Sequence, residues 1–265
     1  MRRSVWSPKD WVPDPVGIEK PAVLFDWGDT LFVIPGMINA PEAHLACARE
    51  VYVRDYAKLV AKRVNPIDAD RFVEAYFATA RQQIKRSAET LREHSFQDRL
   101  VMAFEQCGAP NVLSTNELDQ FAHALCMQVL DGARAVDGAV NAVHRLSKRF
   151  RLGLLSNYPM PVVVEGTLQR FGVDRAFDRV TISGEIGWMK PHENAYRALL
   201  DGFVADPSRA VFVGDNLEND VIGPKRLGLK TAWFAPGKAT PAEPSIDFHA
   251  QTLGELVEWC ERAFD

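Results

Sequence analysis

The chain has 265 residues, 47% of them hydrophobic, which is enough for one large core or two modest ones. Basic residues number 31 and acidic residues 35, so the net charge of −4, without a dense basic run, argues against a nucleic-acid partner. Four cysteines without paired spacing, no evident signal peptide and no bilayer-length apolar run predict a soluble, cytoplasmic protein with reduced thiols.

The first predicted strand ends at a carboxylate. Residues 1–20 hold three prolines and mixed charge without periodicity, and they are predicted to form an N-terminal arm. The run from Ala22 to Phe25 is too short for a helix and uniformly apolar, as in the centre of a parallel sheet. It stops at Asp26. Ligands bind beyond the carboxyl ends of such strands, so Asp26 is predicted to face a site where a cation offsets its desolvation.

A helical stretch follows Pro35-Gly36, which is a candidate hinge. Four amphipathic helices are predicted, and they begin at or just after Pro41, Asp68, Ser95 and Ser114. Gly132 stops the last of them. Because no strand separates these helices, they are predicted to form a small bundle inserted after the first strand.

From Val136 onward the pattern alternates between strands and helices. Strands are predicted at Arg151 to Ser156, Arg179 to Ile182, Ala210 to Gly214 and Lys230 to Phe234. Helices are predicted at Ala139 to Arg149, Pro161 to Phe171, Glu193 to Phe203, Asp220 to Leu227 and Leu253 to Phe264. Such alternation implies an α/β domain with a parallel sheet and right-handed crossovers.

Reactive polar groups follow several of these strands. They are Asp26, the pair Ser156-Asn157, Asp215 and, in the loop after the third strand, Lys190. Singly, each has an ordinary structural explanation as a helix cap, a turn or an exposed loop. Parallel neighbours would gather them at one edge of the sheet, where together they suit phosphoryl transfer. The carboxylate of Asp26 would attack phosphorus and form an aspartyl-phosphate, which divides one displacement into two easier ones.

A cation is needed because an anion then attacks an anion. Mg²⁺ prefers oxygen ligands, and Asp26, the carbonyl of Gly28 and Asp215 are predicted to hold it. Lys190 would add a second positive charge, and the Ser156 hydroxyl with backbone N–H groups would grip the transferring oxygens.

These motifs resemble the haloacid dehalogenase-like hydrolase superfamily, of the subfamily I type with a helical cap. With h for an apolar residue, the matches are hhhhDxxxT-L at Asp26 to Leu31, hhhS-N at Ser156-Asn157, K-P at Lys190-Pro191 and hhhGDxxxxD at Gly214 to Asp220. The similarity covers residues 21 to about 235. It implies a Rossmann-like three-layer sandwich with a parallel sheet, built from residues 21–35 and 136–265, and a mobile four-helix cap over residues 36–135.

The resemblance also assigns roles to the site residues. It implies that Asp26 is the nucleophile, that Lys190 is catalytic and contacts phosphate, and that Asp215 and Asp220 form the acidic pair around Mg²⁺. It makes Ser156, Asn157 and Thr30 the candidate substrate contacts, with Thr30 also supporting the flap after the first strand.

One position departs from the family pattern. The phosphatases usually carry D-x-D-G-T, in which the second aspartate is the general acid and base, whereas this chain has Asp26-Trp27-Gly28-Asp29-Thr30. A backbone carbonyl at Gly28 can still bind metal, but the proton donor is missing. Asp29 is a candidate replacement one residue later, and its alternative role is to brace the turn.

The departure keeps several functions open. The favoured one is a phosphatase of a small phosphorylated metabolite, with no nucleic-acid or membrane partner. A C–halogen hydrolase needs no such acid, and a phosphonoacetaldehyde-hydrolase-like enzyme would need a cap lysine, for which Lys58 and Lys62 are the candidates. A non-enzymatic binder of a phospho-ligand or protein is the remaining alternative. Basic cap residues that would meet an anionic substrate are His44, Arg54, Arg81, Arg86 and His94.

Overall fold

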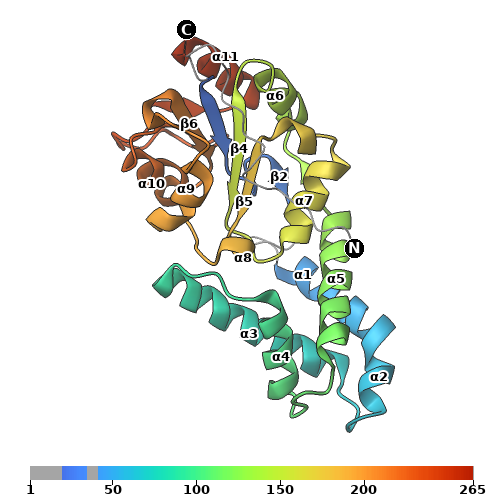
Figure 1. The fold of residues 1–265 in the computed structure, drawn as a ribbon. Coiled ribbons are helices and arrows are strands. Elements are labelled where there is room, and N and C mark those ends of the chain that lie inside the picture. The colour runs from blue at the N-terminus through green and yellow to red at the C-terminus, as the bar shows by residue number, and fades with distance from the viewer. Residues whose placement is uncertain (1–19, 35–40, 265) are drawn as a thin grey trace.

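A six-stranded parallel sheet forms the centre of the molecule (Figure 1). This computed structural model describes residues 20–34 and 41–264, with side chains from Leu45 onward in the second range. The strands are β1 (Ala22–Phe25), β4 (Arg151–Ser156), β5 (Arg179–Ile182), β6 (Ala210–Gly214), β7 (Lys230–Phe234) and β8 (Phe248–Ala250). Their order is β5-β4-β1-β6-β7-β8, so β1 is central, as predicted, and its carboxyl end opens beside those of β4 and β6.

Helices cover both faces of this sheet, because successive side chains of a strand point to opposite faces. Val23 and Phe25 belong to the core formed with α6 (Ala139–Leu146), α7 (Pro161–Arg170) and α11 (Leu253–Ala263). Ala22 and Leu24 pack instead with α9 (Glu193–Leu200). The strand is therefore apolar throughout because it is buried on both sides. This arrangement confirms the predicted three-layer fold.

The helical insertion, Pro41 to Asp131, lies next to the carboxyl edge of the sheet (Figure 1). Its helices are α1 (Pro41–Val51), continued through the π-helical turn η2 (Tyr52–Tyr56) into α2 (Ala57–Ala61), then α3 (Ala69–Thr90), α4 (Phe96–Gln106) and α5 (Thr115–Asp131). N-caps form at three of the predicted helix starts: Asp68 and Ser95 accept backbone N–H bonds, and Ser114 makes a capping box with Glu117. Stacked aromatic rings, including Tyr52 and Phe72 with centroids 4.3 Å apart, fill the interior.

Shorter elements link the layers. They are β2 (Phe32–Val33), β3 (Arg134–Ala135), η3 (Asp174–Ala176), α8 (Ser183–Ile186), η4 (Pro207–Arg209), η5 (Leu217–Ile222) and α10 (Gly223–Lys225). β2 and β3 form an antiparallel ribbon where the insertion leaves and rejoins the sheet domain. Neither this ribbon nor β8 is among the elements predicted from the sequence. The predicted hinge at Pro35-Gly36 and all of the predicted arm except Lys20 lie outside the described residues.

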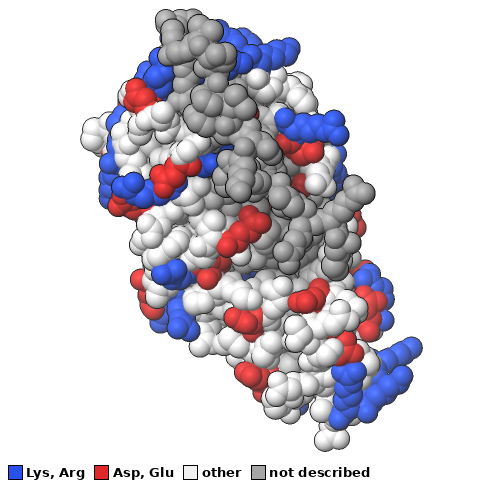
Figure 2. All heavy atoms as spheres, viewed as in Figure 1, with Lys and Arg blue, Asp and Glu red and all other residues white. Residues whose placement is uncertain are grey.

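Charges of both signs are mixed on the face shown in Figure 2. Basic side chains gather at the far end of the insertion, over α2, where Lys58, Lys62 and Arg63 are exposed. Within the described ranges, every helix is too short or too polar to cross a bilayer.

Candidate active site

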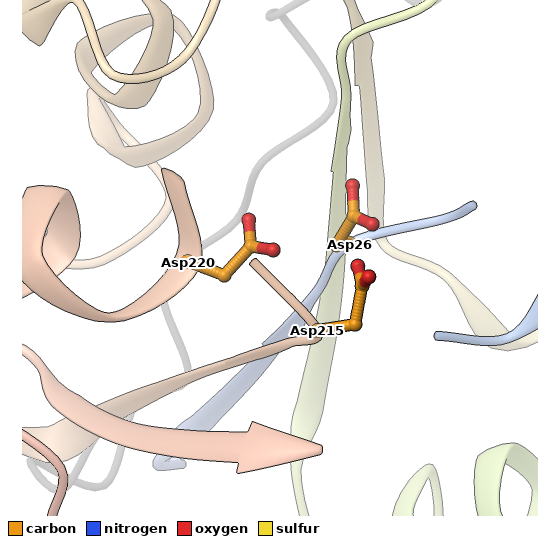
Figure 3. Close-up of side chains that lie close together, drawn as sticks. All are labelled: Asp26, Asp215 and Asp220. Atoms are coloured by element: carbon orange, nitrogen blue, oxygen red, sulfur yellow. The ribbon is translucent and has the colours of Figure 1, made fainter. Parts of the chain in front are cut away.

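Three carboxylates meet beside the carboxyl end of β1 (Figure 3). Asp26 follows β1, Asp215 follows β6, and Asp220 lies in η5, and one oxygen atom from each lies within 4.8 Å of the others. The strands set this geometry, because β1 and β6 are parallel neighbours and the Asp26 N–H donates to the Val213 carbonyl at 2.8 Å. The predicted convergence of strand ends is confirmed for Asp26 and Asp215, and Asp220 joins them from η5.

A buried lysine joins two of the carboxylates. Lys190 Nζ donates to Asp26 Oδ1 and to Asp220 Oδ1, each at 2.7 Å, and Lys190 is only 3% exposed. Burial alone would lower the pKa of Lys190, but the Asp220 and Asp26 carboxylates outweigh it and raise that pKa. The ammonium group therefore stays charged and offsets part of the negative charge of the cluster.

The backbone of Lys190 is fixed by Asn157. Asn157 Nδ2 donates to the Lys190 carbonyl at 2.8 Å, and the Lys190 N–H donates to Asn157 Oδ1 at 2.7 Å. Both polar atoms of the Asn157 amide are thus used to hold the lysine loop against the end of β4. Its predicted contact with substrate stays a prediction, as does that of Ser156, which is buried at the end of β4 one strand from Asp26.

Asp220 depends on a close approach to the β6 end. A Cβ atom at Gly214 would lie 2.3 Å from Asp220 Cγ, so only glycine leaves room for this carboxylate. The Asn216 N–H donates to Asp220 Oδ2 at 3.0 Å. Burial raises the pKa of Asp220, whereas the Lys190 ammonium opposes that increase.

Asp215 is compensated less than Asp220, because the Lys190 charge opposes the rise in its pKa but Lys190 donates its hydrogen bonds to Asp26 and Asp220. Burial first, and then the charges of Asp26 and Asp29, raise the pKa of Asp215 to about 6. No hydrogen bond from another described side chain reaches its carboxylate, and the Gly28 carbonyl accepts no backbone hydrogen bond from the described residues. Hard oxygen donors left in excess of the local positive charge suit a divalent cation such as Mg²⁺.

The turn after Asp26 positions the other predicted residues. Thr30 is fully buried, with Oγ1 3.5 Å from Asp26 Oδ2. Asp29 has a left-handed backbone (φ 55°), and its N–H donates to the Phe32 carbonyl at 2.8 Å, which closes the turn. Its side chain is exposed, yet partial burial and the nearby Asp26 charge raise the pKa of Asp29. Asp29 therefore lies at the rim of the carboxylate cluster.

Comparison with known proteins identifies the family of this chain. The family described as haloacid dehalogenase-like hydrolase matches residues 20–228. The chain belongs to this family of hydrolases.

Relatives of this hydrolase include named phosphatases. It is 32% identical over 134 residues to glyceraldehyde 3-phosphate phosphatase of Pyrococcus furiosus, which covers 49% of this chain and 55% of the relative. The chain thus spans about half the length of the glyceraldehyde 3-phosphate phosphatases that it matches. It is 26% identical over 248 residues to ribulose-1,5-bisphosphate 5-phosphatase of Halopiger xanaduensis, covering 89% of this chain and 98% of that one.

A solved structure shares the fold. The HAD hydrolase YfnB of Bacillus subtilis has a TM-score of 0.58 and 18% identity, with 92% of this chain and 99% of that chain covered. Its structure is described as bound to magnesium and as revealing interdomain movement. At this level of identity the likeness concerns the fold alone.

Two further polar side chains of the helical insertion are wholly or partly buried. His94 Nε2 is buried without a hydrogen-bond partner among the described residues. Arg99 is 8% exposed, its Nε donates to Gln83 Oε1 at 2.9 Å, and no carboxylate oxygen of the described residues lies within 4 Å of its nitrogen atoms. Burial raises the pKa of Tyr158, and the positive charge of Arg99 opposes that rise. Tyr158 directly follows Asn157 in the chain.

The remaining basic candidates of the insertion are engaged or exposed. Arg54 pairs with Asp55 at 2.8 Å, Arg81 lies 4.5 Å from the Phe77 ring centroid, and Arg86 is exposed. The side chain of His44 lies outside the described set. Arg99 was missed, although the sequence held a signal for it: it is a charged residue three positions after Phe96 and four before Ala103, on the apolar stripe of its helix.

Proposed function

We propose that this hydrolase is a Mg²⁺-dependent phosphatase of a small phosphorylated metabolite, acting through an aspartyl-phosphate on Asp26. The observation that carries the proposal is the cluster of Asp26, Asp215 and Asp220 with Lys190 buried between two of them. The names of the relatives add support, since they are phosphatases of phosphorylated small molecules.

In the first step an oxygen of Asp26 forms a bond to phosphorus while the bond from phosphorus to the ester oxygen breaks. Lys190 keeps the Asp26 carboxylate oriented through its 2.7 Å contact. The Ser156 hydroxyl is proposed to bind a non-bridging oxygen of the transferring group. In the second step water attacks phosphorus, which releases inorganic phosphate and restores the Asp26 carboxylate.

The proposed metal ligands are Asp26, Asp215, Asp220 and the carbonyl of Gly28. When bound, Mg²⁺ would neutralise phosphate charge and so permit attack by an anion. The hard oxygen donors gathered around Asp215 support this assignment, because burial and the charges of Asp26 and Asp29 raise the pKa of Asp215 to about 6.

The leaving oxygen must also receive a proton. Gly28 supplies none, and Asp29 is the nearest candidate, since its charge acts on Asp215 and its own pKa is raised by burial and by Asp26.

We propose residues 36–135 as the cap and residues 21–35 with 136–265 as the catalytic domain. In this division we propose His94 and Arg99, whose polar atoms are buried in the cap, as candidates to bind the non-phosphate part of the substrate.

A C–halogen hydrolase is the second candidate. The hydrogen bond from Lys190 to Asp26 would serve that chemistry as well, and halide departure needs no proton at Gly28. Asp215 has no evident task in that chemistry, so the phosphatase is preferred. The C–P alternative lacks support in the structure, because Lys58 and Lys62 are exposed at or just after α2, at the far end of the insertion (Figure 1).

The deciding experiment measures product release by wild type and two variants. Phosphate release from p-nitrophenyl phosphate and a panel of phosphorylated metabolites, with Mg²⁺ or with EDTA, is compared with chloride release from 2-chloropropionate. Asp26→Asn should abolish turnover, while the exposed Asp119→Asn should match wild type. Turnover that survives EDTA and Asp26→Asn would refute the proposal, and chloride release would favour the second candidate.

A further inference from the structure

A short segment of the insertion, residues 91–93, pairs with the core loop that precedes Lys190. We call it the docking segment. The Glu93 N–H donates to the Gly187 carbonyl at 3.2 Å, and the Met189 N–H donates to the Leu91 carbonyl at 3.0 Å. These bonds form an antiparallel bridge in which the Arg92 guanidinium lies 3.2 Å from the centroid of the Trp188 ring.

The side chain of Glu93 reaches Ser183 at the start of α8, and Ser183 in turn contacts the loop after β4. Ser183 Oγ donates to Glu93 Oε2 at 2.6 Å and accepts the Tyr158 N–H at 2.8 Å. The other Glu93 oxygen accepts the His94 N–H at 3.1 Å. Burial raises the pKa of Glu93, and the Ser183 hydrogen bond is the largest opposing influence. A partly buried carboxylate is costly unless it is hydrogen-bonded, so this contact is needed for Glu93 to lie where it does.

The two core loops are joined to each other at the active site. Tyr158 directly follows Asn157, whose amide makes both hydrogen bonds to the Lys190 backbone. The Tyr158 ring also lies 4.9 Å, centroid to centroid, from Trp27, which is next to Asp26. The docking segment therefore contacts the loop that leads to Lys190 directly, and the loop of Ser156 and Asn157 through Ser183.

The chain adopts an unfavourable backbone to make this contact. Leu91, a bulky residue, has a left-handed conformation (φ 54°) at the end of α3. Such conformations in non-glycine residues are costly and persist where the surrounding structure imposes them. Here the turn at Leu91 directs Arg92 and Glu93 onto the core.

We propose that Glu93 is a positioning residue: through Ser183 it holds the loop of Ser156 and Asn157, and with it Lys190, in catalytic geometry only when the insertion is docked. This inference rests on the proposed function of the Asp26 site. It adds that docking of the insertion completes the arrangement of catalytic groups in addition to covering them.

Steady-state kinetics with p-nitrophenyl phosphate and Mg²⁺ test the role. Glu93→Ala should lower kcat by about 10-fold, the effect of one lost hydrogen bond to a charged group, with KM changed less than kcat. Glu93→Gln keeps an acceptor for Ser183 and should recover most of the rate. In the double variant Glu93→Ala/Ser183→Ala, the fold-decrease in kcat should be smaller than the product of the fold-decreases in the two single variants, because the two residues act as one unit.

The matched control is Glu89→Ala, an exposed glutamate one turn earlier on α3. If Glu93→Ala has the kcat of this control, or if the losses multiply in the double variant, the positioning role is wrong.

Amide hydrogen exchange separates this proposal from the proposed function. Residues 156–158 and 187–190 should exchange faster in Glu93→Ala than in Glu89→Ala. A wild-type protein that hydrolyses no phosphate ester would refute the proposed function, while faster exchange would still support the link between docking and the two loops. Equal exchange in the two variants would overturn the link whatever the activity.

Discussion

Asn157 holds the backbone of Lys190 through two hydrogen bonds, one donated and one accepted by the same side-chain amide. Asn157→Asp removes the donor and places a carboxylate against the Lys190 carbonyl, so the lysine loop should shift. We expect kcat/KM to fall by roughly 10-fold to 100-fold, corresponding to about 1–3 kcal/mol for an unsatisfied buried group. Asn194→Asp, at an exposed position on α9, is the matched control. Equal activity of the two variants would show that Asn157 does not position Lys190.

Gly214 is predicted to tolerate no side chain. A Cβ atom there would lie 2.3 Å from Asp220 Cγ, so Gly214→Ala must displace Asp220 from Lys190 or bend the end of β6. Overpacking of this kind costs about 1–3 kcal/mol, and thermal unfolding should show the loss together with reduced turnover. Gly254→Ala is the control, because its nearest neighbour atom would lie 3.8 Å away. An unchanged Tm and rate in Gly214→Ala would contradict the tight packing seen here.

The sequence revealed the carboxylate cluster because parallel neighbours present their carboxyl ends at one edge. Asp26 and Asp215 follow buried apolar strands, and Asp220 is placed by its spacing within one loop. The sequence did not reveal the task of Asn157, since its partner is a backbone carbonyl 33 residues away. Glu93 was missed for a similar reason: its partner Ser183 lies 90 residues away and becomes a neighbour only when the insertion packs on the core.

Short elements were missed for a different reason. β8 has three residues, and the strands of the ribbon have two each, so they are too short for a period of two to be recognised. Their pairing comes from neighbouring strands and not from their own composition.

Acid should weaken one contact within the insertion. Hydrogen bonds from Arg63, and then from Ser114, lower the pKa of Glu117 from its ordinary value of 4.5 to about 2. A group with a lowered folded-state pKa stabilises the protein above its unfolded pKa, and that contribution is lost as pH falls toward 2. Glu117→Gln should therefore destabilise the protein at pH 7, and the difference from wild type should shrink between about pH 5 and pH 3.

Urea unfolding at a series of pH values measures this difference. Glu105→Gln, which removes an exposed carboxylate on α4 for which no ion pair is seen among the described residues, is the matched control. A destabilisation by Glu117→Gln that stays constant down to pH 3 would show that the negative charge of Glu117 contributes nothing through Arg63.

The identity of the leaving group should reveal which residue supplies the proton. Gly28 stands where phosphatases of the family usually carry an aspartate, and Asp29 lies at the rim of the cluster with its backbone closing the turn. A nitrophenolate leaves readily without a proton, whereas an alkyl alkoxide does not. If the acid is absent, kcat/KM should favour p-nitrophenyl phosphate over a sugar phosphate by a margin approaching the ~10²- to 10⁴-fold effect of general acid catalysis. Gly28→Asp should then narrow the margin, and Asp29→Asn should leave it unchanged. Efficient hydrolysis of the sugar phosphate by wild type, lost in Asp29→Asn but retained in Asp119→Asn, would instead assign the proton transfer to Asp29.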